Sequence, residues 1–311
     1  MSTVNYVLVA GNAGVSQLIE RALGWGGPVV AIVAGPEDLA RRVAGTGVAR
    51  VEWLGATDGR AVEAFAPAAA RLVAAQPGNV LAGRRPAERV WLGAVAAAIG
   101  APLVSGLVDL EPRAGGVAAT REVGGGIALE TIQFDGPVAL MADGGPPIAA
   151  GSGDAEVAER TASDTYDIKV VSVAPADGAG GDLATAKLVV AAGRGFRDRG
   201  DLALAEGLAR ALGAVVACSR PLAEGLEWMG KERYVGISGN QIAPELYLAA
   251  GISGQLQHMS GVRGAGTVVA INTDAAAPIV AQADYALVGD LYEVLPALTA
   301  ALTAASTAAR A

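Results

Sequence analysis

A glycine-rich turn beside the chain's single histidine is the segment best suited to chemistry. Residues 251–258 read GISGQLQH, and His258 is the one histidine among 311 residues. We predict that a short apolar strand or helix end runs into a Gly-Ser-Gly turn and that a helix begins near Gln257. Backbone N–H groups of such a turn can bind an anion or an electron-rich ring oxygen, and an imidazole ordinarily titrates near neutrality. Spacing alone is equally typical of a glycine-rich turn with a structural histidine.

Further polar residues follow the predicted strands of the C-terminal half. These strands are KLVVAAG (187–193), AVVACSR (214–220), YVGIS (234–238), TVVAIN (267–272) and ADYALVG (283–289). Parallel strands end at one edge of a sheet, where ligands bind. The residues expected at this edge are Arg194, Ser219, Arg220, Gly236 to Gly239, Asn272 and Asp290. Cations, hydroxyls, an amide and an acid together suit a dinucleotide with a pyrophosphate, a polyol and a polar ring system.

An ordinary NAD-binding fingerprint is absent from the chain. Gly11 and Gly14 have the wrong spacing for GxGxxG, and Gly193-Arg-Gly195 continues as Phe-Arg-Asp. The sequence therefore disfavours the usual Rossmann NAD site.

Five segments, in this order and at these distances, resemble the C-terminal FAD domain of electron transfer flavoprotein alpha subunits. They are GRG (193–195), ACSRP (217–221), YVGISGNQIAPELYL (234–248), VVAINTD (268–274) and PIVAQADYALVGDL (278–291). The run from Ala243 to Asn272, with APELY, GISG, QH and AIN in register, is the specific part of the match. The resemblance is close over about 187–300 and extends to 1–186 only in general layout.

The resemblance implies FAD-binding roles for residues of the C-terminal half. In the family, the GRG arginine contacts FAD, and the Ser-Arg pair binds it with the arginine against the flavin ring, where a guanidinium can stack. The turn at 253–256 would hold the phosphates and ribityl chain, Gln257 the ribityl hydroxyls, and His258 the flavin edge near O2. The implied contacts are Arg194, Ser219, Arg220, Val235, Gly236, Ile237, Ser238, Ser253, Gly254, Gln255, Leu256, Gln257, His258, Asn272 and Asp290.

Several of these residues also have purely structural interpretations. Arg194 could be a solvated charge, Ser219 a strand-end hydroxyl, and Arg220 a surface ion pair with Glu224. Asp290, which the resemblance assigns with Asn272 to the adenosine half, could cap the following helix and do both. For His258 we expect an imidazolium that stabilises negative charge on the reduced flavin, with a pKa raised by that charge.

The loop around 234–240 departs from the family. Where the family commonly has Gln-Thr-Gly-Lys, this chain has Ile237-Ser238-Gly239-Asn240, and Tyr234 replaces a usual Gln. Ser238 keeps a hydroxyl that could bond flavin N5, whereas Ile237 and Asn240 remove polar contacts. The flavin potential and the partner specificity are the properties that this departure affects.

Composition narrows the class of protein. A hydrophobic fraction of 52%, a charged fraction of 17% and 43 glycines fit a two-domain α/β protein with buried parallel strands. The net charge of −8 argues against nucleic acid and anionic membrane as partners. A single cysteine and a single histidine argue against disulfides and metal sites. We expect a cytoplasmic protein without a signal peptide. The run 90–108 carries no charge and is long enough to span a membrane, but Gly100–Pro102 is expected to divide it into a helix and a strand.

Alternating patterns place the regular elements of the N-terminal half. Strands are expected at 5–10, 28–34, 48–54, 78–82 and 102–108, with helices at 14–23, 36–44, 59–75 and 86–99. This alternation predicts a parallel sheet covered on both faces. Residues 117–123, 126–133 and 137–142 are expected to be antiparallel strands. Residues 143–186 should connect the domains, with one strand-like run from Asp167 to Val173. In the C-terminal half we expect helices at 200–212, 278–282 and 291–303.

The resulting expectation is a two-domain α/β protein. Residues 1–186 would form a Rossmann-like parallel-sheet domain that docks on a beta subunit, and 187–311 an FAD-binding domain of deoxyhypusine-synthase-like type. The resemblance implies an electron carrier rather than an enzyme, paired with a beta subunit that holds AMP or, in bifurcating members, a second FAD. A dehydrogenase would be the donor and a redox partner the acceptor, without nucleic acid or membrane insertion.

Two other functions remain open from the residues. One is a stand-alone FAD or NAD enzyme of the same fold, for which His258 is the one visible base because Lys231 lies in a variable loop. The other is a nucleotide-binding scaffold that has lost flavin, which the changes at Ile237 and Asn240 favour.

Overall fold

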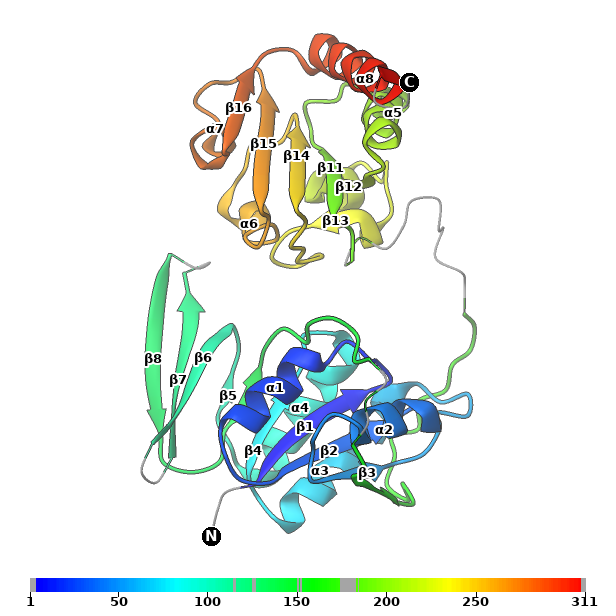
Figure 1. The fold of residues 1–311 in the computed structure, drawn as a ribbon, viewed down its shortest axis with the longest axis vertical. Helices are drawn as coiled ribbons and strands as arrows, with labels where there is room; N and C mark the ends of the chain where they lie inside the picture. Colours follow the sequence, from blue (N-terminus) through cyan, green and yellow to red (C-terminus); the bar gives the residue numbers. More distant parts are fainter. Residues whose placement is uncertain are drawn as a thin grey trace. The chain divides into compact units, whose positions relative to one another are not determined.

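The chain forms two compact units, Met1–Val173 and Ala174–Ala311. The structure is a computed structural model that describes residues 4–113, 116–124, 127–149, 151, 153–173, 183 and 185–308. Figure 1 shows both units coloured along the sequence. Each is an α/β structure built on a parallel sheet, as the alternating sequence pattern predicts.

The first unit contains a seven-stranded parallel sheet in the order β10-β3-β2-β1-β4-β9-β5, of which Figure 1 labels β1 to β5. Its strands are β1 (Asn5–Ala10), β2 (Val29–Ala34), β3 (Arg50–Trp53), β4 (Asn79–Ala82), β5 (Leu103–Val104), β9 (Ala139–Met141) and β10 (Glu156–Glu159). Its helices are α1 (Ser16–Gly24), α2 (Glu37–Ala44), α3 (Ala66–Ala75), which follows a 3-10 turn at Val62–Phe65, and α4 (Pro86–Ile99).

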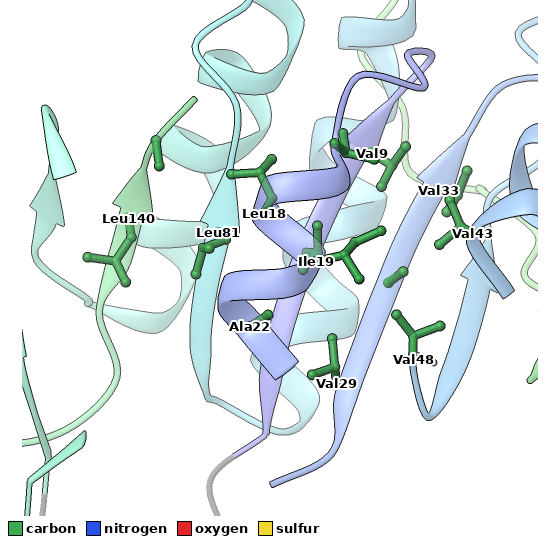
Figure 2. Packing of buried hydrophobic residues seen from close by; sticks show 14 of the residues in the cluster. Val9, Leu18, Ile19, Ala22, Val29, Val33, Val43, Val48, Leu81 and Leu140 are labelled. Atoms are coloured by element: carbon green, nitrogen blue, oxygen red, sulfur yellow. The ribbon is translucent and has the colours of Figure 1, made fainter. Parts of the chain in front are cut away.

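The central strands of this sheet are buried on both faces. Val7 and Val9 of β1 join a core with α1 and α2, which Figure 2 shows around Leu18 and Ile19. Tyr6 and Leu8, which point to the other face, join a second core with α3 and α4. Because successive side chains of a strand alternate between faces, an uninterrupted apolar strand such as 5–10 requires helices on both sides.

Three expectations for this unit are wrong. Residues 102–108 are not one strand, because the chain bends at Gly106 (φ +71°) into β6 (Leu107–Arg113). Residues 137–142 do not form an antiparallel strand, since β9 pairs in parallel with both β4 and β5. The strand of the connecting segment is β10 rather than 167–173, where Lys169 makes an isolated bridge to Arg60.

Two of the three strands expected to be antiparallel are confirmed, in a separate sheet whose other strand, β6, was not predicted to be antiparallel. It joins β6, β7 (Gly116–Val123) and β8 (Ala128–Phe134) in that order. Thr120 faces Thr131 across the strands with their hydroxyls 2.8 Å apart, and Arg121 pairs with Glu130. Cross-strand pairs of this kind stabilise a sheet face that is open to solvent.

The second unit contains a six-stranded parallel sheet in the order β13-β12-β11-β14-β15-β16. Its strands are β11 (Leu188–Ala192), β12 (Val215–Ser219), β13 (Tyr234–Val235), β14 (Leu246–Ala250), β15 (Thr267–Asn272) and β16 (Tyr285–Val288). Its helices are α5 (Leu202–Leu212), α6 (Leu256–Met259), α7 (Pro278–Gln282) and α8 (Leu291–Ala308). In chain order this is a 3-2-1-4-5-6 arrangement, so the direction of connection reverses between β11 and β14.

No helix in the described residues has both the length and the apolar character that a membrane crossing requires. The charge-free run 90–108 is instead divided between α4, which ends at Ile99 as predicted, and the strands β5 and β6. Gly100, in a left-handed conformation, ends α4.

Candidate functional site

A cavity of about 920 Å³ lies at the carboxyl edge of the second sheet. Its walls come from the segments that follow β11, β12, β13, β14, β15 and β16, and all of its lining residues belong to the second unit. The segments after β11 and β14 flank the point at which the strand order reverses. In open α/β sheets this reversal leaves a crevice where ligands bind.

Most of the residues singled out in the sequence meet in this cavity. Those that line it are Arg194, Ser219, Arg220, Ile237, Ser238, Ser253, Gln255, Gln257, His258, Asn272 and Asp290. Val235, Gly236, Gly254 and Leu256 are not among the residues that line it. Val235 is fully buried in β13, and a Cβ on Gly254 would lie 2.4 Å from Ile279 Cβ, so these two positions support the wall through packing.

Close backbone contact explains the two glycine motifs at the reversal point. A Cβ on Gly193 would lie 2.3 Å from the Gly251 carbonyl oxygen, and one on Gly195 would lie 2.6 Å from Gly251 Cα. Gly195 N–H donates to that carbonyl at 2.9 Å, and Gly251 has φ +63°. Only glycine permits this approach and this conformation together. The GRG and GISG turns are therefore in close contact with each other in the cavity wall.

Arg220 makes the surface ion pair that the sequence left open and also lines the cavity. Its Nε lies 2.7 Å from Glu224 Oε2, and 67% of its side chain is exposed. Hydrogen bonding to Glu224 raises the pKa of Arg220. The guanidinium is thus a permanent cation held beside the cavity.

Asp290 caps α8, as the structural interpretation predicted. Its Oδ1 accepts the Tyr292 N–H at 2.9 Å, and its Oδ2 lies 3.5 Å from Arg197 Nη2. Because Asp290 also lines the cavity, capping and ligand binding are compatible there.

Arg197 and Tyr292 are wall residues that the sequence interpretation missed. The Arg197 guanidinium lies 4.5 Å from the centre of the Tyr292 ring, a cation–π geometry. The Tyr292 hydroxyl accepts a hydrogen bond from the backbone N–H of Arg197 at 2.7 Å and donates one to the Asp201 carboxylate at 2.5 Å. These partners are more than 90 residues apart in the chain, so no local spacing could have revealed them.

The residues that depart from the family form their own hydrogen-bonded loop. Asn240 Nδ2 donates to the carbonyls of Glu232 (2.8 Å) and Tyr234 (3.0 Å). The hydroxyls of Tyr234 and Ser238 lie 3.0 Å apart. Ile237, 53% exposed, contributes an apolar surface to the cavity wall. Asn240 therefore supports the loop, and Ile237 changes the polarity of the wall.

His258 is buried, with 8% of its surface exposed. Its Nε2 lies 2.7 Å from the hydroxyl of Tyr247, and its Nδ1 is buried without a hydrogen-bond partner of normal geometry in the described part of the chain. Burial lowers the pKa of His258 to about 4, against an opposing effect of the Val235 backbone. These protein surroundings by themselves disfavour the imidazolium, and the charge expected on His258 beside a reduced flavin stays a prediction.

The cavity residues fit an FAD molecule. The volume is at the upper end of the ~300–1,000 Å³ range of ligand pockets. The main-chain N–H groups of 253–256 are not bonded to carbonyls elsewhere in the described residues, and such groups can hold a pyrophosphate. At the carboxyl edge of the first sheet, by contrast, the loops after β1 and β9 are in close backbone contact. A Cβ on Gly144 would lie 2.0 Å from the Gly14 carbonyl oxygen.

Comparison with known proteins shows the family of the chain. Residues 182–263 match the model of the electron transfer flavoprotein FAD-binding domain, and residues 12–176 match that of the electron transfer flavoprotein domain. Protein FixB of Salmonella typhimurium is 38% identical over 260 residues, which cover 80% of this chain and 83% of FixB. Protein FixB of Escherichia coli is 58% identical over 121 residues, which cover 39% of each chain. The cofactor is FAD, and the chain belongs to the electron transfer flavoprotein family as one of its alpha subunits.

Proposed function

We propose that this chain holds one FAD in the cavity of its second unit and relays electrons from a dehydrogenase to a redox acceptor, in a heterodimer with a beta subunit. The observation that carries the proposal is the cavity at the reversal point, whose polar walls match the parts of a dinucleotide. FAD, when bound, supplies the electron-transfer chemistry, and the protein supplies position and electrostatics.

The polar residues of the cavity suit different parts of the FAD molecule. Backbone N–H groups of 253–256 and the cation of Arg194 suit the pyrophosphate, and the Asp290 carboxylate suits ribose hydroxyls. Arg220 suits the flavin ring, because a planar guanidinium can stack on it and donate hydrogen bonds. Ile237 leaves one part of the wall apolar, which lowers the local polarity around the ring.

The state of His258 supports a carrier over a stand-alone enzyme. Neither ring nitrogen is exposed as a base, because one bonds Tyr247 and the other is buried. The first unit would dock on the beta subunit, which would hold AMP or a second FAD. Whether the complex bifurcates electrons would then depend on the beta chain.

The test is to express this chain with and without a beta-like partner and to measure flavin content and mass. We expect a yellow 1:1 heterodimer whose alpha chain retains FAD. A matched Arg194→Ala, Arg220→Ala double variant should be pale, because two of the three arginines that line the cavity are lost. A colourless wild-type complex would refute FAD binding, and a yellow monomer that turns over a substrate would identify an enzyme instead.

A further inference from the structure

Tyr234 is a buried tyrosine whose hydroxyl meets a polar side chain of the cavity wall. It lies in β13 with 4% of its surface exposed, and its hydroxyl lies 3.0 Å from the Oγ of Ser238. Both residues line the cavity. β13 pairs with β12 so that Val235 lies opposite Ser219, and the loop after β13 therefore begins beside the Ser219–Arg220 segment. The pair of hydroxyls thus belongs to the part of the wall that we assign to the flavin ring.

The loop from 236 to 239 holds the tyrosine ring in place. A Cβ on Gly236 would lie 2.8 Å from the Tyr234 hydroxyl oxygen, and one on Gly239 would lie 2.6 Å from Tyr234 Cδ1. The two glycines therefore let the main chain lie directly against the ring and its hydroxyl. Gly239 N–H donates to the Gly236 carbonyl at 3.0 Å, and Asn240 N–H donates to the Tyr234 carbonyl at 2.8 Å. Because these bonds close the loop, the Ser238 hydroxyl is held against that of Tyr234.

Hydrogen-bond accounting gives the direction of this contact. Each hydroxyl has one proton to donate and can also accept. Among the described residues, the Tyr234 hydroxyl has Ser238 Oγ as its hydrogen-bond partner, so a Tyr234 O–H that did not donate to it would be a buried donor without an acceptor. A phenol is also a stronger acid than an alcohol and hence the better donor. The Tyr234 O–H therefore donates to Ser238, and the proton of the exposed Ser238 hydroxyl is left for a ligand in the cavity.

We propose that Tyr234 is a positioning residue, which donates a hydrogen bond to Ser238 Oγ and so directs the Ser238 O–H toward an acceptor atom of the flavin ring. This inference rests on the proposed function and concerns a position at which this chain departs from the family. A hydroxyl that accepts one hydrogen bond donates a stronger one, and an acceptor that gains negative charge on reduction binds a donor more tightly. Tyr234 should therefore raise the potential at which the flavin takes up its first electron.

Potentiometry on the FAD-loaded complex tests this role. Tyr234→Phe keeps the ring and removes the hydroxyl, so the equilibrium constant of the first one-electron reduction should fall by a factor of about 3 to 10, which is about 30 to 60 mV. Tyr285→Phe is the matched control, because Tyr285 is 68% exposed in β16 and should leave the potential unchanged. An unchanged potential in Tyr234→Phe would refute the proposal.

A double-mutant cycle separates action through Ser238 from packing. Ser238→Ala alone should lower the potential at least as far as Tyr234→Phe does. Adding Tyr234→Phe to Ser238→Ala should then lower it no further, because the hydroxyl through which the tyrosine acts is already absent. Additive shifts would show that Tyr234 affects the flavin by another route and would overturn the proposal.

Replacement of Tyr234 by 3-fluorotyrosine tests the direction of the hydrogen bond with little change in shape. Fluorine makes the phenol a stronger donor and a weaker acceptor. Donation from Tyr234 to Ser238 predicts that the potential rises, opposite to the effect of Tyr234→Phe. A fall, or no change, would mean that Tyr234 does not act as this donor. The same measurement decides the question if Tyr234→Phe does not fold.

The outcomes also separate this inference from the proposed function. A wild-type complex that lacks flavin absorbance altogether refutes FAD binding. A complex that binds FAD, but whose potential does not respond to changes at Tyr234, refutes only the positioning role.

Discussion

Replacing His258 should remove a pH-dependent part of the stability of the second unit. Burial lowers the pKa of His258 from 6.5 to about 4. Between these values the unfolded chain binds a proton that the folded chain does not, so stability is full above about pH 6.5 and is lost as the pH falls toward 4. For one group with this shift, the free energy of unfolding should fall by about 2 kcal/mol between pH 7 and pH 5.

Urea denaturation of flavin-free wild type and of His258→Gln at several pH values measures this loss. Glutamine cannot titrate, whereas every other ionisable group is shared, so the difference between the two proteins isolates His258. We expect the advantage of wild type to shrink by about 2 kcal/mol from pH 7 to pH 5. Parallel stability profiles would show that the ring titrates equally in both states and would refute the burial argument.

The other predictions concern the glycine contact in the cavity wall, Arg220 and the unit that holds the cavity. Gly251→Ala should lower the free energy of unfolding by about 2–4 kcal/mol in urea, because its Cβ would meet Gly195 and its φ is positive; Gly225→Ala, which has open space, is the control. Arg220→Ala should raise the FAD dissociation constant about tenfold in a fluorescence titration, and Arg220→Lys should restore it only in part; an unchanged constant would leave Arg220 as the partner of Glu224 alone. Residues 174–311, expressed with the beta subunit, should retain FAD measured by absorbance, whereas flavin found on 1–173 instead would contradict the site.

Local pattern was sufficient for most elements of the fold. The helix at 86–99 was predicted to the residue, because Pro86 suits a first helical turn and Gly100 suits a left-handed cap. The strand at 267–272 was equally well defined by its apolar run. The weaker predictions were strands whose partners are distant: β9 is three residues long, and its parallel pairing with β4 and β5 depends on contacts about 35 to 60 residues away.

The residues of the candidate site also fall into those that local sequence pattern predicted and those that it missed. The order of polar residues after strands was enough to bring Arg194, Arg220 and Asp290 to one edge, because parallel strands share their carboxyl ends. Arg197 and Tyr292 were missed because their contact joins segments that are not close in the chain.

His258 shows which properties follow from the sequence and which depend on the tertiary structure. The amino-acid sequence alone determined the α/β class, the position of the GISG turn and the place of His258 beside it. The charge of that histidine depends on how much water reaches the ring and on which atoms face it, and the sequence does not encode these locally. Only the tertiary structure shows these surroundings: the ring is buried, its pKa is lowered by that burial to about 4, and its Nε2 lies 2.7 Å from the Tyr247 hydroxyl.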